Sequence, residues 1–473
     1  MFRIEKDILG EKEVPKERYY GIHTARSIEN FKISGMKNDE DLIKSIIYLK
    51  ISCAKANYEL NLLSKEKADA IIKSCEEILE NFENFRDEFP IDIFHAGSGT
   101  SLNMNVNEVI ANKAIEILYG KENIGKKLIH PNDDVNKGQS TNDIIPSAIK
   151  ISSFLLLKNL KCALKNFENE LRKKEKEFKK ILKSGRTHLQ DAVPITLGQE
   201  FGCYAEEIKK DIKRINLVES FLLSIPIGGN AVGTGINTKK NFGDKVVKNL
   251  NEILKEKLTD KKFKVAKGIT ERISLIQFLT DIAHLSSILK LIAIDLNKIS
   301  NDLRLMNSGP NTGFNEIFIP AVEPGSSIMP GKINPSINEA INQVCYKIIG
   351  DDVTITNCCA AGQLELNTHM PIIANLILNN IKILTNAINI FAEKVIKGIK
   401  ANEEKCRFYA ENSLGLITVL NPILGYDKCA EIAKKSRETK KSIIEILIED
   451  KYLTKKEIKK ILNVKFLTEP NLK

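Results

Sequence analysis

The sequence has no tryptophan, few prolines and no long apolar run. Only 14 prolines occur in 473 residues, which leaves room for long uninterrupted helices. The first residues, Met1 to Asp7, lack the apolar core of a signal peptide. No stretch approaches the roughly 18 apolar residues that a membrane span needs. We therefore expect a cytoplasmic protein that does not partner a membrane.

Patterns for metal binding, disulfides and two common enzyme classes are also lacking. The nine cysteines are an odd number without metal-ligand spacing, and no histidines are paired at such a spacing. We interpret the neighbouring Cys358 and Cys359 as small buried side chains. A Gly-x-Ser-x-Gly elbow is absent, which disfavours a hydrolase triad. A phosphate-binding P-loop is excluded because Ile333 follows Lys332.

Basic residues exceed acidic ones, and the formal net charge is +10. The lysines are interleaved with glutamates, as in residues 173–177, which is typical of a solvated helix face. A nucleic-acid binder would concentrate its cations on one face or in a tail. We therefore predict no nucleic-acid partner, although a basic molecule would attract anionic substrates modestly.

The composition that remains is that of a globular protein, with 42% hydrophobic and 28% charged residues. The length favours about three domains. We place a mixed, mostly helical domain at residues 1–141 and a central long-helix bundle at 142–399. A small helical domain follows at 400–473, where Thr454 and Glu457 form a capping-box signal.

Apolar residues recur at spacings of three and four from Leu157 to Ile181 and again from Leu275 to Leu303. Such a repeat predicts helices packed at a shallow angle, as in a bundle. Further apolar residues lie outside the second stripe, which indicates burial by other subunits. A third helical segment is expected from about 338 to 399, bent near Pro371. Residues 262–266 are the one weak strand candidate, so the fold class is mainly α.

Four loops are dense in glycine, small hydroxyls and amides, and each precedes an apparently helical stretch. Backbone N–H groups at a helix N-terminus, together with such side chains, suit a carboxylate. Any one loop alone is better explained as ordinary helix capping. Four in one chain favour a shared anion site. They are residues 97–105, 139–143, 185–191 and 323–334.

The loop around Ser326 is the most unusual of the four. Gly325 and Gly331 flank Ser326 and Ser327, and Lys332 follows. A mobile loop of this kind could present a hydroxyl while the lysine binds a carboxylate as a point charge. Serine is a poor base unless N–H groups, a cation or exclusion of water stabilises its alkoxide. Among the six histidines we single out His188, which lies in a polar loop.

These motifs together resemble the fumarase and aspartase superfamily over nearly the whole chain. The segment Gly325-Ser-Ser-Ile-Met-Pro-Gly-Lys-Ile-Asn-Pro335 is similar to that family's signature loop. Residues 185–194 and 228–235 are similar to further shared blocks. The resemblance implies elimination across a Cα–Cβ bond and three mainly helical domains. It also implies a homotetramer with a central helix bundle, whose active sites are made from three subunits.

The resemblance also implies roles for individual residues. Ser326 matches the base that removes the Cβ proton, and Lys332 and Asn334 match residues that hold one substrate carboxylate. His188 matches a position near the leaving group, and Glu339 matches its partner. The pair is a candidate general acid, and a role in substrate positioning is an equal alternative. Further positions match residues that bind the other substrate carboxylate or lie near the leaving group. They are Thr100, Ser101, Ser140, Thr141, Asn142, Thr187 and Ser327.

Several blocks favour the ammonia-lyase (aspartase) branch over the hydratase (fumarase) branch. They are residues 19–26, Thr100 to Asn103, Thr141, and residues 361–367. The expected reaction is therefore reversible removal of ammonia from L-aspartate to give fumarate. Three positions depart from the family pattern, Asp134, Gly138 and Asn311, and none of them is a residue named above.

No cofactor is expected to be required, and no metal site is predicted, because loops and side chains supply the groups that an elimination needs. Activation by a divalent cation is left open. Fumarate hydratase is the main alternative function. A helical-bundle binding protein without activity is a further alternative, but such a chain would be expected to lose the hydroxyl and amide positions first, and all are present.

Overall fold

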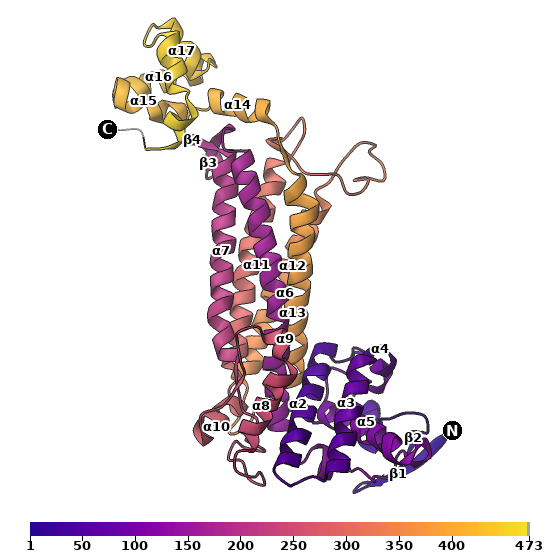
Figure 1. Ribbon diagram of the computed structural model, residues 1–473. Helices are drawn as coiled ribbons and strands as arrows, with labels where there is room; N and C mark the ends of the chain where they lie inside the picture. The colour runs from indigo at the N-terminus through magenta and orange to yellow at the C-terminus, as the bar shows by residue number, and fades with distance from the viewer. Residues whose placement is uncertain (471–473) are drawn as a thin grey trace. The chain divides into compact units, whose positions relative to one another are not determined.

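The computed structural model describes residues 1–470 and is mainly helical, with four small two-stranded sheets (Figure 1). The chain divides into two compact units. Unit 1 comprises residues 1–161, 213–290 and 347–383, and unit 2 comprises 162–212, 291–346 and 384–470. The prediction of a mainly α fold is confirmed. The proposed domain boundaries after residues 141 and 399 remain predictions.

Five long helices contribute residues to both units. Their apolar stripes are buried as the three-and-four spacing predicts, as for Leu157, Leu285 and Leu296. They are α6 (Thr141–Glu177), α7 (Leu197–Leu222), α11 (Thr280–Met306), α12 (Ser336–Ala360) and α13 (Met370–Ile390).

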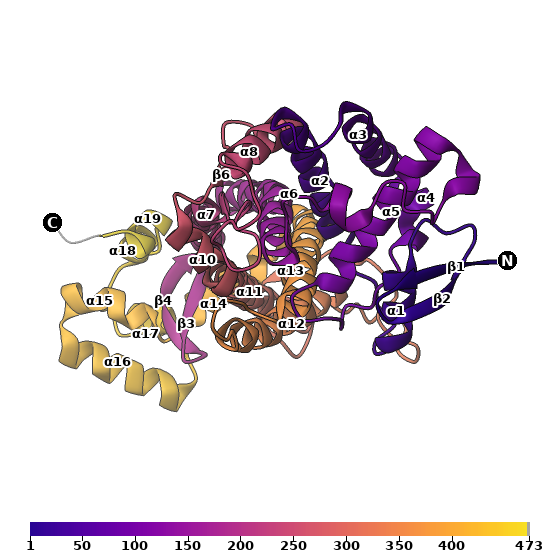
Figure 2. The same ribbon diagram turned by 90° about the horizontal axis from the view of Figure 1, so that it is seen from below.

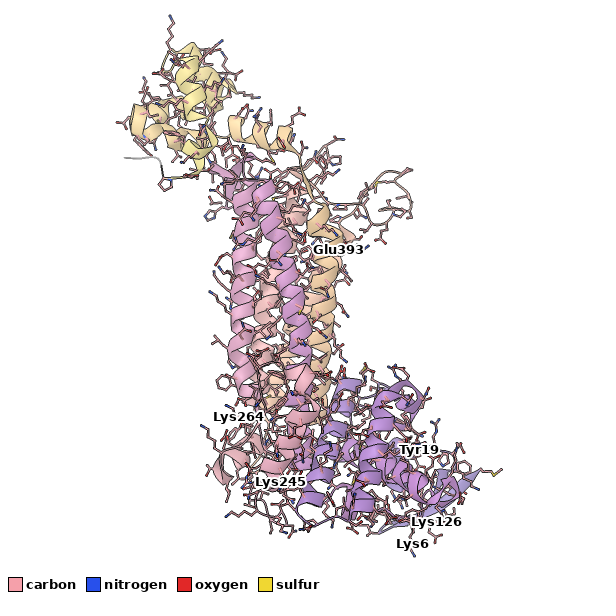
Figure 3. All side chains as sticks on the ribbon, viewed as in Figure 1. Lys6, Tyr19, Lys126, Lys245, Lys264 and Glu393 are labelled. Carbon is pink, nitrogen blue, oxygen red and sulfur yellow. The ribbon has the colours of Figure 1, made fainter. Side chains whose placement is uncertain are left out.

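Unit 1 holds the N-terminal elements. Its β1–β2 hairpin lies beside α1 in Figure 2, and Tyr19, labelled in Figure 3, donates its hydroxyl to Glu116 at 2.7 Å. The weak strand candidate is confirmed, because Lys264 and Val265 pair in parallel with Ser224 and Ile225. The elements are β1 (Phe2–Asp7), β2 (Gly10–Pro15), α1 (Ile22–Asn30), α2 (Glu40–Glu59), α3 (Lys65–Glu80), α4 (Phe82–Phe85), α5 (Thr100–Tyr119), β5 (Ser224–Ile225), α8 (Phe242–Ile253), α9 (Lys255–Leu258), β6 (Lys264–Val265) and α10 (Ile269–Gln277).

Unit 2 holds the remaining short elements. The C-terminal helices have their own apolar core, centred on Ile432, Ile446 and Leu447. The predicted capping box is present, with Thr454 and Glu457 bonded to each other's backbone at the start of α18. The elements are β3 (Leu182–Thr187), β4 (Gln190–Thr196), β7 (Ile317–Phe318), β8 (Lys400–Ala401), α14 (Glu403–Asn412), α15 (Leu416–Leu424), α16 (Tyr426–Thr439), α17 (Ile443–Glu449), α18 (Lys455–Ile461) and α19 (Val464–Thr468).

Two helix predictions are corrected. The expected helix from Leu275 to Leu303 is broken, because Phe278 adopts an extended conformation between α10 and α11. The third segment is interrupted at residues 361–369 rather than bent at Pro371, which is the second residue of α13, where proline is tolerated. The amide of Asn367 donates to the carbonyl oxygens of Cys358 and Cys359 and so caps the end of α12.

The hydropathy of α13 is higher than the sequence analysis expected. Residues Met370–Gly398 are long and apolar enough to cross a membrane by length and composition, and α10 with α11 passes the same test as a pair bent by 51°. In the stretch from Met370, 61% of the apolar window is buried within the chain. Ile373, Ile377 and Ile381 are fully buried, as expected for the core helix of a bundle.

The packing of unit 2 gives a stability prediction. Phe167 of α6 and Phe391 are fully buried, and their rings stack with centroids 5.1 Å apart. Phe167→Ala should lower the free energy of unfolding by about 3–5 kcal/mol, because it removes this contact and leaves a cavity. Urea unfolding measures the loss. Phe408→Ala is the control, since that ring is 53% exposed. Equal losses for the two variants would contradict the prediction.

Candidate functional site

The start of α6 forms one part of the candidate site, in unit 1. Ser140, Thr141 and Asn142 stand at the helix N-terminus, half-buried. Beneath them Asp143 is fully buried, and its carboxylate accepts N–H groups of Ser140 (2.9 Å), Gly228 (3.1 Å) and Asn230 (2.8 Å). Three donors on one carboxylate hold the two loops in a fixed relation. The Ser140 hydroxyl oxygen accepts the backbone N–H of Asn142 at 3.2 Å.

A buried lysine lies behind this turn and was missed in the sequence. Lys50 of α2 is fully buried, and its ammonium donates to Asn136 and Gln139, each at 2.9 Å. Asn103 donates to Asn136 (3.3 Å) and to the Thr141 hydroxyl (3.1 Å), which links the lysine to the turn. The lysine lies in an apolar helix, where its charge has no distinctive spacing.

Burial sets the ionisation of the two charged groups beneath the turn. It lowers the pKa of Lys50 to about 8 and raises the pKa of Asp143 to about 7. The positive charge of Lys50 favours the charged form of Asp143, and the negative charge of Asp143 favours the charged form of Lys50. A cation bonded only to neutral amide oxygens adds positive potential beneath a turn predicted to hold a carboxylate.

The start of α5 provides a second turn in unit 1. Thr100 is the first residue of the helix, and its hydroxyl is 2.9 Å from that of Ser98. A Cβ atom on Gly97 would lie 2.1 Å from the carbonyl oxygen of Thr368, so this close approach requires glycine. Ser101 is 1% exposed in one chain, and its place in the substrate site stays a prediction.

The predicted loop at residues 185–191 is instead the end of a β-hairpin in unit 2. Strands β3 and β4 pair antiparallel, with Thr187 opposite Gln190. His188 and Leu189 form the two-residue turn with positive φ angles of 55° and 58°, which suits a tight hairpin. Thr187 and His188 are therefore exposed at the hairpin tip. The helix α7 begins only at Leu197.

The Ser326 loop is open and lies between β7 and α12 in unit 2 (Figure 1). Its base is closed by Gly325, where a Cβ atom would lie 2.2 Å from the carbonyl oxygen of Lys332, and by a bond from the Asn334 amide to Gly325. The Ser326 hydroxyl oxygen accepts the backbone N–H groups of Ile328 (3.3 Å) and Met329 (3.0 Å). Donors of this kind are one of the features expected around a serine base, and the role of Ser326 as the base stays a prediction.

A cavity of about 700 Å³ opens at the root of this loop and is lined by Lys332, Asn334, Glu339 and Arg304. Glu339 lies 3.7 Å from Arg304. Across residues 1–470 of one chain, no hydrogen bond or ion pair joins Glu339 to His188. The expected pairing is therefore not made within a chain, because Glu339 lies in the first turn of α12 while His188 lies at the exposed hairpin tip.

The predicted site residues thus fall into two groups. Thr100 and the Ser140 turn belong to unit 1, and the hairpin tip and the Ser326 loop belong to unit 2. Within the described residues no group of three or more His, Cys, Asp or Glu side chains could hold a metal ion. Of the three departures, Gly138 has a φ of +72°, Asp134 pairs with Lys67 at 2.7 Å, and Asn311 is exposed.

Comparison with known proteins agrees with this architecture. The Lyase family model matches residues 10–350, and the model for the fumarase C C-terminus matches residues 416–469. Aspartate ammonia-lyase of a Bacillus species is 44% identical over 470 residues, which cover 99% of this chain and 98% of that protein. Aspartate ammonia-lyase of Escherichia coli strain K12 is 41% identical, covering 100% of this chain and 97% of that protein.

Solved structures are similar over the same extent. The fumarate lyase:delta crystallin from Brucella melitensis, bound to cobalt, superposes with a TM-score of 0.94 at 40% identity, covering 99% of this chain and 100% of that one. A class II fumarase from Schistosoma mansoni gives a TM-score of 0.93 at 35% identity, with 99% of each chain covered.

The chain therefore belongs to the lyase superfamily that contains the fumarases and aspartases. Within that superfamily it is a carbon–nitrogen lyase of the aspartate ammonia-lyase group. The predicted resemblance and the choice of the ammonia-lyase branch over the hydratase branch are both confirmed.

A histidine beside the Thr100 turn gives a pH prediction. Burial lowers the pKa of His95 to about 4, and neither ring nitrogen has a hydrogen-bond partner among the described residues. The unfolded imidazole has a pKa of about 6.5, so only the unfolded chain binds this proton in between. The free energy of unfolding should fall as pH falls, by about 2 kcal/mol from pH 8 to pH 5 for this group.

His95→Gln removes this titration while keeping a polar side chain of similar size. The difference between wild type and variant in urea unfolding at pH 8 and at pH 5 isolates the contribution of His95. An identical pH dependence in the two proteins would show that the imidazole titrates normally.

Proposed function

We propose that this enzyme removes ammonia reversibly from L-aspartate to give fumarate, with Ser326 as the base. The observation that carries the proposal is the pair of backbone N–H groups on the Ser326 hydroxyl oxygen. Such donors stabilise the alkoxide that the serine must become. Across residues 1–470 no N–H group donates to the hydroxyl of Ser327, so the geometry favours the first of the two serines.

In the proposed step, Ser326 takes the proton from Cβ of the substrate. The electron pair of that C–H bond becomes the Cα–Cβ double bond, and the C–N bond breaks to release the amine as ammonia. Negative charge builds on the carboxylate next to Cβ in the transition state. Preorganised donors placed at that carboxylate lower the barrier more than they favour the ground state. Lys332 and Asn334, beside the loop cavity, are proposed to supply them.

The remaining residues are proposed to bind and orient the substrate. Thr100, Ser140, Thr141 and Ser327 grip the other carboxylate. Asn142, Thr187 and His188 lie near the amine. His188 with Glu339 of another subunit is the candidate acid, with substrate positioning as the alternative role. No cofactor is needed in this reaction, because the chain's own hydroxyl, amide and ammonium groups supply every function in it.

We further propose a cytoplasmic homotetramer whose active sites combine residues from three chains. The exposed position of His188 and the division of the site residues between two units support this arrangement. Exposed apolar side chains on the long helices support it too, since Ile294 is 45%, Tyr346 57% and Val353 59% exposed in one chain.

The substrate prediction is tested by following the absorbance of fumarate with L-aspartate and, separately, with L-malate. We expect fumarate to form from L-aspartate, because the chain belongs to the ammonia-lyase group. Turnover of L-malate alone would overturn the assignment in favour of a hydratase.

The base is tested with two neighbouring serine variants. Ser326→Ala should lower kcat by about 10²–10⁴-fold, the usual contribution of a positioned general base. Ser327→Ala is the matched control and should act mainly on KM, because that residue is proposed to bind a carboxylate. Gel filtration and thermal unfolding check that both variants fold and assemble. A larger loss of kcat in Ser327→Ala would show that the wrong serine has been named.

A further inference from the structure

Arg186 stands two residues before His188 on β3 and is held more firmly than any role in a surface hairpin requires. Its guanidinium donates to Glu316 at 2.8 Å. It also lies over two aromatic rings, 4.2 Å from the centre of Phe314 and 5.3 Å from that of Tyr409. Phe314, Glu316 and Tyr409 together are called the Arg186 clamp below. All of these residues belong to unit 2.

The clamp is built on a buried carboxylate. Glu316 is fully buried and also pairs with Lys183 at 2.8 Å, another buried residue of β3. Two cations on one strand therefore share one buried anion. A buried carboxylate without these partners would be strongly destabilising, so the positions of Lys183 and Arg186 are tightly determined.

The hairpin beyond the clamp is short, and Asp191, the strand partner of Arg186, accepts the backbone N–H of Leu414 at 3.3 Å. The strand register shifts between Ser184 and Arg186, which marks a bulge. Beyond the bulge only the pairs Arg186–Asp191 and Thr187–Gln190 remain before the turn, and residues 187–190 are exposed. The direction in which the tip presents Thr187 and His188 thus depends on where Arg186 and its strand partner Asp191 are fixed.

The third member of the clamp comes from the C-terminal helices. Tyr409 belongs to α14, and its hydroxyl donates to the carbonyl oxygen of Gly313, beside Phe314. The same helices contact β4 directly, since a Cβ atom on Gly415 would lie 1.9 Å from the carbonyl oxygen of Ala192. The C-terminal helices and the hairpin therefore form one packed arrangement, with Arg186 between them.

We propose that Arg186 is a positioning residue of the active site, and that its clamp sets the orientation of Thr187 and His188 for the substrate amine. The inference rests on the proposed function for the placement of those two residues. Arginine is required rather than lysine, because only a planar guanidinium can pair with Glu316 while it stacks between two rings.

Two substitutions test the clamp from opposite sides. Arg186→Lys keeps the charge opposite Glu316 and loses the stacking, and Tyr409→Leu removes one ring. Each should lower kcat/KM for L-aspartate by about tenfold, the size expected for the loss of a partly buried cation–π contact. Tyr409→Phe keeps the ring and should restore activity to within about threefold of wild type. Phe408→Leu changes the neighbouring exposed ring as a matched control.

A double-mutant cycle separates positioning from a general structural effect. Each clamp variant is combined with Thr187→Val and His188→Ala together, and kcat/KM is compared with that of the Thr187→Val/His188→Ala protein. If the clamp acts through the tip, a clamp substitution should lower kcat/KM by less than about threefold once the tip side chains have been removed. Thermal unfolding and gel filtration confirm that every variant is folded and assembled.

Three results would overturn the proposal: wild-type activity in both Arg186→Lys and Tyr409→Leu, equal losses with and without the tip side chains, or wild-type activity in the tip variant itself. None of these depends on the base. Activity of wild type on L-aspartate and its loss in Ser326→Ala test the proposed function separately, so failure of the clamp and failure of the proposed function are distinguishable.

Discussion

Buried carboxylates that collect donors from several loops hold the candidate site in shape. Asp143 binds three backbone N–H groups beneath the Ser140 turn, and Glu316 binds two cations of β3. Glu108 of α5 does the same for the segment Gly21 to Thr24, accepting three N–H groups and the Thr24 hydroxyl. Irregular backbone cannot satisfy its own polar groups, so a side chain on a rigid helix or beside a strand must do so. The glycine-rich loops of this enzyme depend on these charges for their conformation.

The depth of burial strongly influences the pKa, and so the protonation state, of such a carboxylate. Asp92 also accepts three backbone N–H groups, and although burial acts to raise its pKa, these bonds bring the pKa to about 2. Asp143 also accepts three backbone N–H groups but lacks the hydroxyl donor that Ser34 gives Asp92; it is fully enclosed, and desolvation raises its pKa to about 7. The backbone N–H groups of Ser140 and Asn230 favour its charged form, and the nearby ammonium of Lys50 acts in the same direction. Ionisation beneath the Ser140 turn thus depends on two helices, α2 and α6, that meet only in the folded chain.

The sequence predicted the parts of the structure that follow from local pattern. The long helices follow from their apolar spacing, and the start of α18 follows from the capping box at Thr454. The sequence pattern at Thr187 predicts a loop and not the hairpin, because the two-residue turn of His188 and Leu189 lacks the usual glycine or asparagine signal. The break at Phe278 was missed because apolar spacing continues through it, although the backbone there is extended.

The candidate site was predictable to the extent that its residues stand in polar loops. Lys50 and Arg186 could not be found in this way, since their significance lies in distant partners such as Gln139 and Tyr409. The choice between Ser326 and Ser327 shows the same limit. By spacing alone the two adjacent serines are equivalent, and the family resemblance is what matches Ser326 to the base. The structure adds the backbone N–H groups of Ile328 and Met329, which donate to the Ser326 hydroxyl oxygen. Motif spacing therefore predicts which loops face the substrate, while the direction of the N–H groups in the folded chain favours one hydroxyl over its neighbour as the proposed base.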